Sequence, residues 1–169
     1  MKIPSNTFQP SRLAAKLELY RQDFELFACR ELKIQTKRQA LEPFVLRPFQ
    51  QKLVRGMLDQ WKRLGYVRQA WLKSRQIGTT TIGSGWSFWR TALNPNVNSI
   101  VVAHEIPIAE EIFTKAKRFY ENLGSDIRPM LRYSTKQHLE FDNPSDRTRL
   151  THPGLRSKLV VATAKNIHV

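Results

Sequence analysis

The spacing of apolar residues predicts three amphipathic helices. Apolar positions recur three and four residues apart over residues 13–31, over 48–64 and over 107–123, which is the periodicity of a helix with one buried face. Pro48 suits the first turn of the second helix, and Gly65 is a plausible stop for it. A further segment, 82–91, can also be helical.

Short β-branched runs predict the strands. The segments expected to be strands are 66–73, 99–103, 138–142, 147–151 and 158–163. The first two flank the helical segment 82–91, so we expect a strand–helix–strand crossover with parallel strands. The third and fourth flank Asn143-Pro144-Ser145, which favours a hairpin.

The segment between the first predicted strand and the next helix carries a possible phosphate-binding turn, Lys73-Ser74-Arg75-Gln76-Ile77-Gly78-Thr79-Thr80. A glycine-bearing turn there lets backbone N–H groups and a helix N-terminus converge on a phosphate. In the usual spacing, G-x-x-x-x-G-K-[ST], Gly78 and Thr80 match the second glycine and the hydroxyl. However, Thr79 stands at the lysine position and Lys73 at the first glycine. A threonine-rich helix start beneath a basic strand end explains these residues equally well.

Composition narrows the class of protein. The chain has 169 residues, of which 41% are hydrophobic, enough for one folded domain with a real core. Its 28 Lys and Arg against 14 Asp and Glu give a net charge of +14, which favours a polyanionic partner, nucleic acid first. A basic protein with a merely solvated surface is the alternative. The single Cys29 excludes an internal disulfide framework, and no membrane span or signal peptide is visible, so we expect a soluble intracellular protein.

Several strings together resemble the large terminase subunit of tailed bacteriophages, the ATPase of the DNA-packaging motor. The loop string S-R-Q-x-G-x-T-T is fairly specific, and the others follow in the family's order. The strings are Leu46-Arg47-Pro48-Phe49-Gln50, Ser74-Arg75-Gln76-Ile77-Gly78-Thr79-Thr80, Ile100-Val101-Val102-Ala103-His104, Leu139-Glu140-Phe141-Asp142-Asn143 and Leu159-Val160-Val161-Ala162-Thr163-Ala164.

This resemblance implies an α/β fold with a mainly parallel sheet of the P-loop NTPase type. Residues 1–45 would form an N-terminal helical extension and connector, and residues 46–169 the N-terminal part of the ATPase domain. Because the chain stops just after a predicted strand, the sheet is expected to be incomplete at the C-terminus. The family's catalytic carboxylates and nuclease domain would lie beyond residue 169, so the chain alone is expected to hydrolyse ATP negligibly.

The resemblance also implies ATP and Mg²⁺ as cofactors. Gln50 would read the adenine edge, the alternative being an exposed glutamine at a helix start. Lys73 would replace the missing loop lysine and, with Arg75, would act in catalysis. Thr80 would ligate magnesium. The remaining nucleotide-binding residues would be Ser74, Gln76, Gly78 and Thr79.

The implied partners are double-stranded DNA, the small terminase subunit, the portal protein of the procapsid and further copies of the chain in a ring, all in the host cell cytoplasm. Three basic runs are candidates for DNA contact, and the sequence does not select among them. They are Lys115, Lys117 and Arg118; Arg128, Arg132 and Lys136; and Arg147, Arg149, Arg156 and Lys158.

Two rival interpretations stay open. A helicase-like translocase would share the glutamine, the parallel sheet and the charge. A non-enzymatic DNA-binding module with a decayed loop would explain Thr79 and the lack of a strand ending in a magnesium-binding carboxylate. Glu105, after the strand at 99–103, is the nearest candidate for that carboxylate, and it also fits a helix N-terminal acid.

Overall fold

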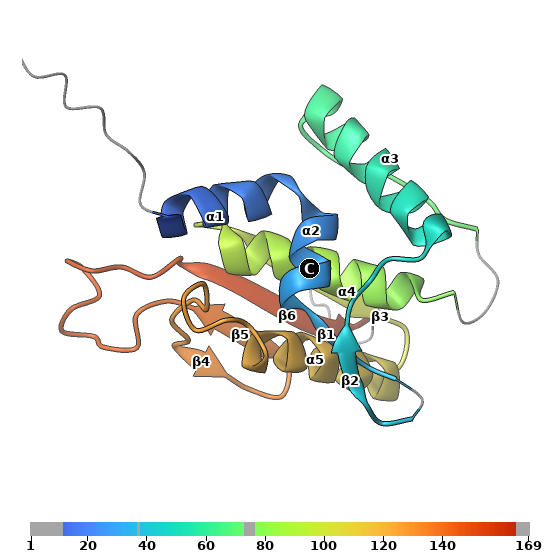
Figure 1. Cartoon of the computed structure of the whole chain (residues 1–169). Helices are drawn as coiled ribbons and strands as arrows, with labels where there is room; N and C mark the ends of the chain where they lie inside the picture. The colour runs from blue at the N-terminus through green and yellow to red at the C-terminus, as the bar shows by residue number, and fades with distance from the viewer. Residues whose placement is uncertain (1–11, 37, 73–76, 165–169) are drawn as a thin grey trace, which may run out of the picture.

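The computed structural model describes residues 12–36, 38–72 and 77–164 (Figure 1). The helices are α1 (Arg12–Gln22), α2 (Phe24–Glu31), α3 (Pro48–Leu64), α4 (Thr79–Leu93) and α5 (Ile106–Glu121). The strands are β1 (Lys33–Gln35), β2 (Leu41–Pro43), β3 (Asn98–Ala103), β4 (Tyr133–Ser134), β5 (His138–Phe141) and β6 (Ser157–Thr163). The α/β class predicted from the sequence is confirmed.

The main sheet has four strands in the order β3-β6-β5-β4 and is mixed. β3 and β6 run parallel, with Asn98 opposite Lys158 and Ala103 opposite Thr163. β5 is antiparallel to both β6 and β4. The prediction of a mainly parallel sheet is therefore wrong for the described residues. The short link between β4 and β5 explains their pairing, because strands joined by a tight turn pair antiparallel, whereas β5 and β6 are antiparallel across the longer segment 142–156.

The strand predicted over 66–73 does not form. Residues 67–72 have no regular structure, and Lys73 lies outside the described residues. The side-chain amide of Gln60 accepts a hydrogen bond from the Arg68 N–H (3.1 Å) and donates one to the Arg68 carbonyl (3.2 Å). This amide satisfies the two backbone groups that a neighbouring strand would otherwise bind.

The second strand of the predicted hairpin, 147–151, is instead a series of turns. Asn143 organises it: its side chain donates to Thr148 Oγ1 (3.0 Å) and to the His152 carbonyl (2.8 Å). Asp142 closes the same segment by accepting from the N–H groups of Asn143 (2.8 Å) and Gly154 (2.9 Å). These local bonds compete successfully with strand pairing.

The N-terminal region is more divided than its apolar pattern predicts. The single helix expected over 13–31 breaks at Asp23, whose carboxylate accepts from the Leu26 N–H (2.9 Å) and so caps α2. The connector beyond it contains the hairpin β1–β2. α3 agrees with the prediction, because it begins at Pro48 and ends at Gly65, which has a φ of 75°.

Helix α4 lies between the sheet and the N-terminal helices. Phe88 packs against Phe119 of α5 and Phe141 of β5 at ring distances of 5.8 and 6.1 Å, while Trp89 packs against Phe24 of α2 at 5.5 Å. At Gly85, an added Cβ would already be 3.4 Å from Phe24, so the helices approach closely there.

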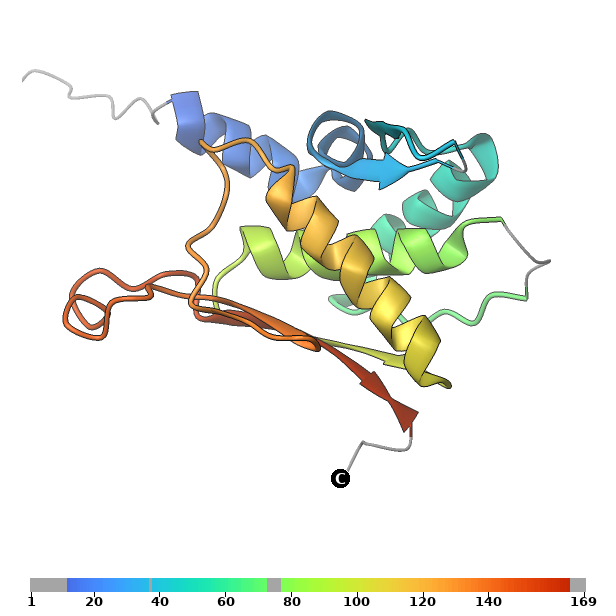
Figure 2. The ribbon, with the colours of Figure 1, turned by 90° about the horizontal axis from the view of Figure 1, so that it is seen from below.

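All the helices lie on one side of the main sheet (Figure 2). On the other side, Ile100 and Val102 of β3 are 65% and 49% exposed. Within the described residues no helix covers that second face of the sheet. Among these helices, none has both the length and the apolar run needed to cross a bilayer.

We expect Asp142→Ala to destabilise the fold by about 2 kcal/mol, since two backbone N–H groups lose a charged acceptor. Asp142 is 1% exposed and also pairs with Arg149 Nε at 2.7 Å. Urea unfolding measures the loss. The control is Asp146→Ala in the same turn segment, where the side chain is 81% exposed and the loss should stay within about 1 kcal/mol. Equal losses in the two variants would contradict the role given to Asp142.

The same carboxylate should make stability depend on pH. Desolvation acts to raise the pKa of Asp142, but the bonds from Asn143, Gly154 and Arg149 lower that pKa below its ordinary value. Its contribution is thus present above the unfolded pKa of about 3.9 and is lost as pH falls through the lower folded value. Acid unfolding followed by circular dichroism should show a steeper loss for the unaltered chain than for Asp142→Ala.

Candidate functional site: the cleft at the start of α4

The glycine of the predicted turn sits where a helix begins. Gly78 has a φ of 81°, in the left-handed region, and its carbonyl accepts the first helical bond, from the Ile82 N–H (3.1 Å). α4 therefore starts at Thr79, earlier than the 82–91 segment predicted. Thr79 is buried and Thr80 is exposed. The N–H groups of a first helical turn have no partner within the helix, which makes this helix end electropositive.

A cleft of about 540 Å³ opens at this helix start. It brings together four of the residues predicted as nucleotide-binding, namely Gln50, Gly78, Thr79 and Thr80. Its other walls come from the start of α3, from the β1–β2 hairpin and from α5. The remaining predicted residues, Lys73, Ser74, Arg75 and Gln76, lie outside the described part of the chain.

Gln50 is 5% exposed, so the alternative of an exposed helix-start glutamine is wrong. Its Oε1 accepts from the Arg47 N–H (3.0 Å), and its Nε2 donates to the Ile77 carbonyl (3.1 Å). The side chain thus caps α3 and holds the residue before Gly78 at the same time. One N–H and one lone pair of the amide remain for any other partner.

Sequence reasoning missed Lys115 as a lining residue of this cleft. It lies on α5, pairs with Glu111 Oε1 at 2.7 Å, and its side chain is 22% exposed. Arg47 is a second cationic lining residue, so the described part of the cleft lining has two cations and one carboxylate. The sequence offered only the i,i+4 pair of Glu111 and Lys115, which predicts a solvated helix face as readily as a site.

The donor set suits phosphate groups better than it suits a metal alone. Within the described residues there is no group of three His, Cys, Asp or Glu side chains able to hold a metal ion. Among the described lining residues Glu111 supplies the one carboxylate, and Thr80 is one of several with a hydroxyl oxygen. Proteins often bind Mg²⁺ through one or two carboxylates together with substrate phosphates. Glu105 does not line the cleft: it precedes α5, beside His104 at 3.7 Å.

Several cations of the predicted DNA-contact runs are already bound within the protein. Arg128 donates to the Leu123 carbonyl (2.6 Å), Arg132 pairs with Asp146 (2.8 Å), and Arg149 pairs with Asp142. Lys117 and Arg118 of the first run bind Glu121 and Gln35. Part of each basic run is therefore already bound within the protein and is less available for contact with DNA.

No protein-family model matches the chain, and no curated protein matches it. The resemblance to terminases therefore rests on the sequence strings given above.

We expect Gly78→Ala to destabilise the protein by about 1–2 kcal/mol, because an alanine is strained at a φ of 81°. Its Cβ would also lie 2.6 Å from Gln50 Nε2, so the Gln50 amide that binds the Ile77 carbonyl would have to move. The control is Gly83→Ala within α4, where nothing lies within 4 Å of the added Cβ. That variant should be stabilising by about 0.5–1 kcal/mol, since alanine favours a helix. Thermal unfolding of both variants checks the opposite signs.

Proposed function

We propose that the chain belongs to an ATP-driven motor that translocates double-stranded DNA, of the large terminase subunit type, and that it binds the phosphates of ATP in the cleft at the start of α4. The observation that carries this proposal is the convergence of Gln50, Gly78, Thr79 and Thr80 with Lys115 on one cleft. The loop strings that resemble terminases support it independently. A P-loop NTPase fold is part of the proposal.

The chemistry of phosphate binding follows from the cleft residues. The first N–H groups of α4 would donate to phosphate oxygens, and Gly78 lets the backbone approach them without a side chain in the way. Lys115 would supply the positive charge that Thr79 cannot, reaching in from α5. Mg²⁺, when bound with the nucleotide, would neutralise further phosphate charge, with the Thr80 hydroxyl as its protein ligand.

DNA would be held by charge. Lys136, Arg147, Arg156 and Lys158 make no ion pair within the described residues, so the third basic run keeps the largest share of free cations. Contacts of this kind neutralise phosphates and carry no sequence information. We further propose that the chain binds the small terminase subunit and the portal protein of the procapsid. In the complete motor it would form a homo-oligomeric ring, and it would act in the host cytoplasm.

The second candidate is a DNA-binding module that does not hydrolyse nucleotide. Two observations favour it. The Gln50 amide is already engaged by Arg47 and Ile77, which competes with adenine recognition, and residues 67–72 form no strand ahead of the loop. A helicase-like translocase remains compatible with the cleft as well.

We expect Lys115→Ala to weaken binding of a fluorescent ATP analogue by about tenfold, since a charge-assisted contact contributes about 1.5–3 kcal/mol. The matched control is Lys117→Ala on the same helix, whose side chain is 54% exposed and pairs with Glu121 outside the cleft. Fluorescence anisotropy with magnesium present gives both affinities. If the unaltered chain does not bind the analogue, the DNA-binding module is favoured. If the two variants lose affinity equally, Lys115 is not part of the site.

DNA binding should be salt-sensitive and independent of sequence, because the net charge of +14 acts through phosphates. Titrations of two unrelated duplexes at several salt concentrations should give matching affinities that fall together as salt rises. A flat salt response, or a strong preference for one duplex, would count against the proposal.

A further inference from the structure

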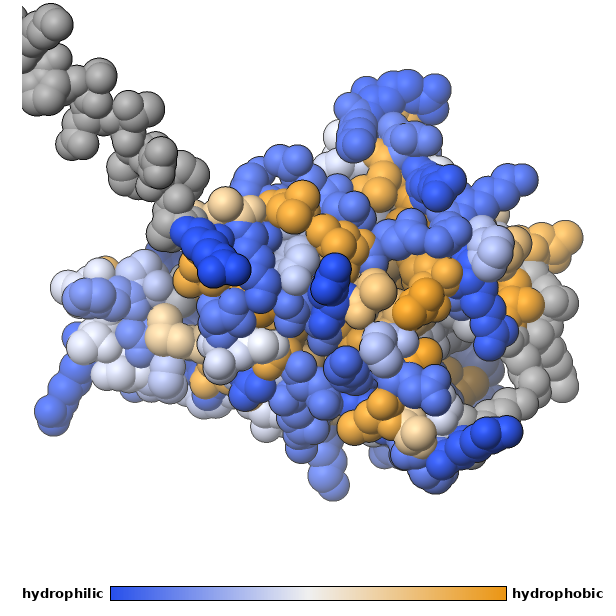
Figure 3. All heavy atoms as spheres, viewed as in Figure 1, coloured by the Kyte–Doolittle hydropathy of each residue, from blue (hydrophilic) through white to orange (hydrophobic). Residues whose placement is uncertain are grey.

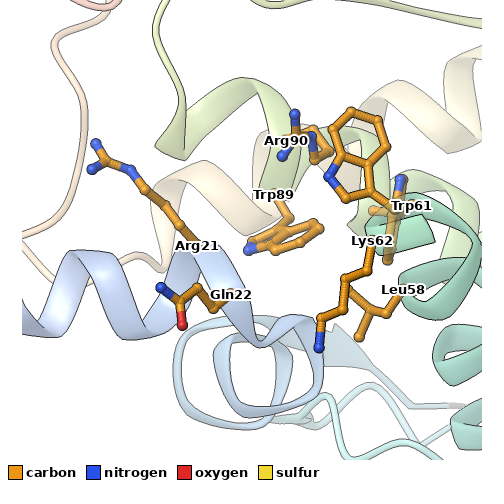
Figure 4. Close-up of a pocket in the computed structure, with 8 residues that line it drawn as sticks. Arg21, Gln22, Leu58, Trp61, Lys62, Trp89 and Arg90 are labelled. Atoms are coloured by element: carbon orange, nitrogen blue, oxygen red, sulfur yellow. The ribbon is translucent and has the colours of Figure 1, made fainter. Parts of the chain in front are cut away.

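A second pocket, of about 260 Å³, lies between α1, α3 and α4 (Figure 4). α1 provides Arg21 and Gln22, and α3 provides Leu58, Trp61 and Lys62. The last two turns of α4 provide Trp86, Trp89 and Arg90. On the molecular surface, apolar residues border α3 on the side that faces the other helices (Figure 3).

The pocket gathers three of the four tryptophans of the chain. Trp86 and Trp89 touch each other at a ring distance of 4.9 Å, and Trp89 is fixed by donating its indole N–H to the Tyr20 carbonyl (2.7 Å). Trp61 is 39% exposed, so its ring is accessible from the pocket mouth. Trp89 is itself 2% exposed, so Trp61 and the half-buried Trp86 are the rings that a flat aromatic group can contact.

The charge of this pocket is entirely positive. Its lining includes Arg21, Lys62 and Arg90, and no acidic residue. Arg90 is half-buried and stacks on Trp61 at 4.4 Å, yet its guanidinium forms no hydrogen bond or ion pair with the described residues. Desolvation lowers the pKa of Arg90, as expected for a cation without a counter-charge. A half-buried cation of this kind favours an anionic ligand.

We propose that this pocket binds one nucleotide unit of a single-stranded nucleic acid, with the base against Trp61 and Trp86 and the phosphate beside Arg90 and Lys62. Single-strand binding sites combine stacking aromatic rings with a cationic surface that follows the backbone. The pocket volume lies just below the usual range of about 300–1,000 Å³ for drug-sized ligands, so it accepts a single ring system. A base within a duplex is stacked on its neighbours and cannot enter.

This site is separate from the cleft that we assign to ATP. Thr79 stands in the first turn of α4 and Arg90 in its last, so the two sites lie about 16 Å apart along the helix. The two lining sets share no residue. The pocket proposal therefore does not depend on nucleotide binding at the other end of the helix.

The test measures binding of a labelled oligothymidylate by anisotropy and by quenching of tryptophan fluorescence. Trp61→Ala should weaken binding about tenfold and remove much of the quenching, because one stacking contact is lost. Trp61→Phe keeps an aromatic ring and should retain most of the affinity. Lys62→Ala should also weaken binding, while the matched control Lys52→Ala, an exposed lysine of the same helix outside the pocket, should change it less than about twofold.

Three outcomes would overturn the proposal. One is an equal loss for Lys52→Ala and Lys62→Ala, which would indicate general charge alone. Another is thymidine monophosphate competing as strongly as the oligonucleotide, which would assign the pocket to a free nucleotide. The third is polyglutamate binding with the same dependence on Trp61, which would assign the pocket to an acidic peptide. Circular dichroism of each variant must match that of the unaltered chain.

Discussion

The packing of α4 against both of its neighbouring layers is the constraint on which the rest of the structure depends. Phe88 faces α5 and the sheet, while Trp89 faces α2. Gly85 lies where the layers approach closely: an added Cβ would already meet Phe24 and Phe44 at 3.4 Å, which leaves no room for a larger side chain. Burial of such aromatic residues contributes more to folding than any single polar contact in the molecule.

The middle of α4 is held on two sides, and its last turn is also tied to the sheet by the hydrogen bond between the Thr91 and Ser99 hydroxyls (2.7 Å), so this packing positions the helix ends. The first turn of α4 lines the cleft that contains Lys115. The last turns present Trp86, Trp89 and Arg90 to the second pocket. One helix thus carries a candidate anion-binding site of a different kind at each end, one based on backbone donors and the other on aromatic rings and guanidinium groups.

Side-chain amides determine much of the local architecture. Gln50 ties the start of α3 to Ile77, Gln60 binds both backbone groups of Arg68, and Asn143 organises the turns before β6. Each amide satisfies backbone groups that a strand partner would otherwise satisfy. This explains why residues 67–72 and 147–151 form no strand although their sequence predicts one, since a backbone group needs a partner but not a particular one.

Local sequence patterns predict the position of a helix or strand correctly where residues within that element determine its ends. Pro48 and Gly65 bound α3 as predicted, and the β-branched runs at 99–103 and 158–163 became β3 and β6. Gly78 was recognised as the glycine of a turn before a helix, and its left-handed φ agrees with that role. Such features depend on the conformational preferences of nearby residues, which the sequence states directly.

Tertiary structure alone decided the strand order and the composition of both candidate sites. The antiparallel pairing of β5 depends on which strands become neighbours in space. Lys115 reaches the cleft across 35 positions of sequence from Thr80, and Trp61 meets Arg90 only because α3 folds back over α4. Local periodicity does not predict these contacts between residues far apart in the sequence, because they depend on the packing of the whole core.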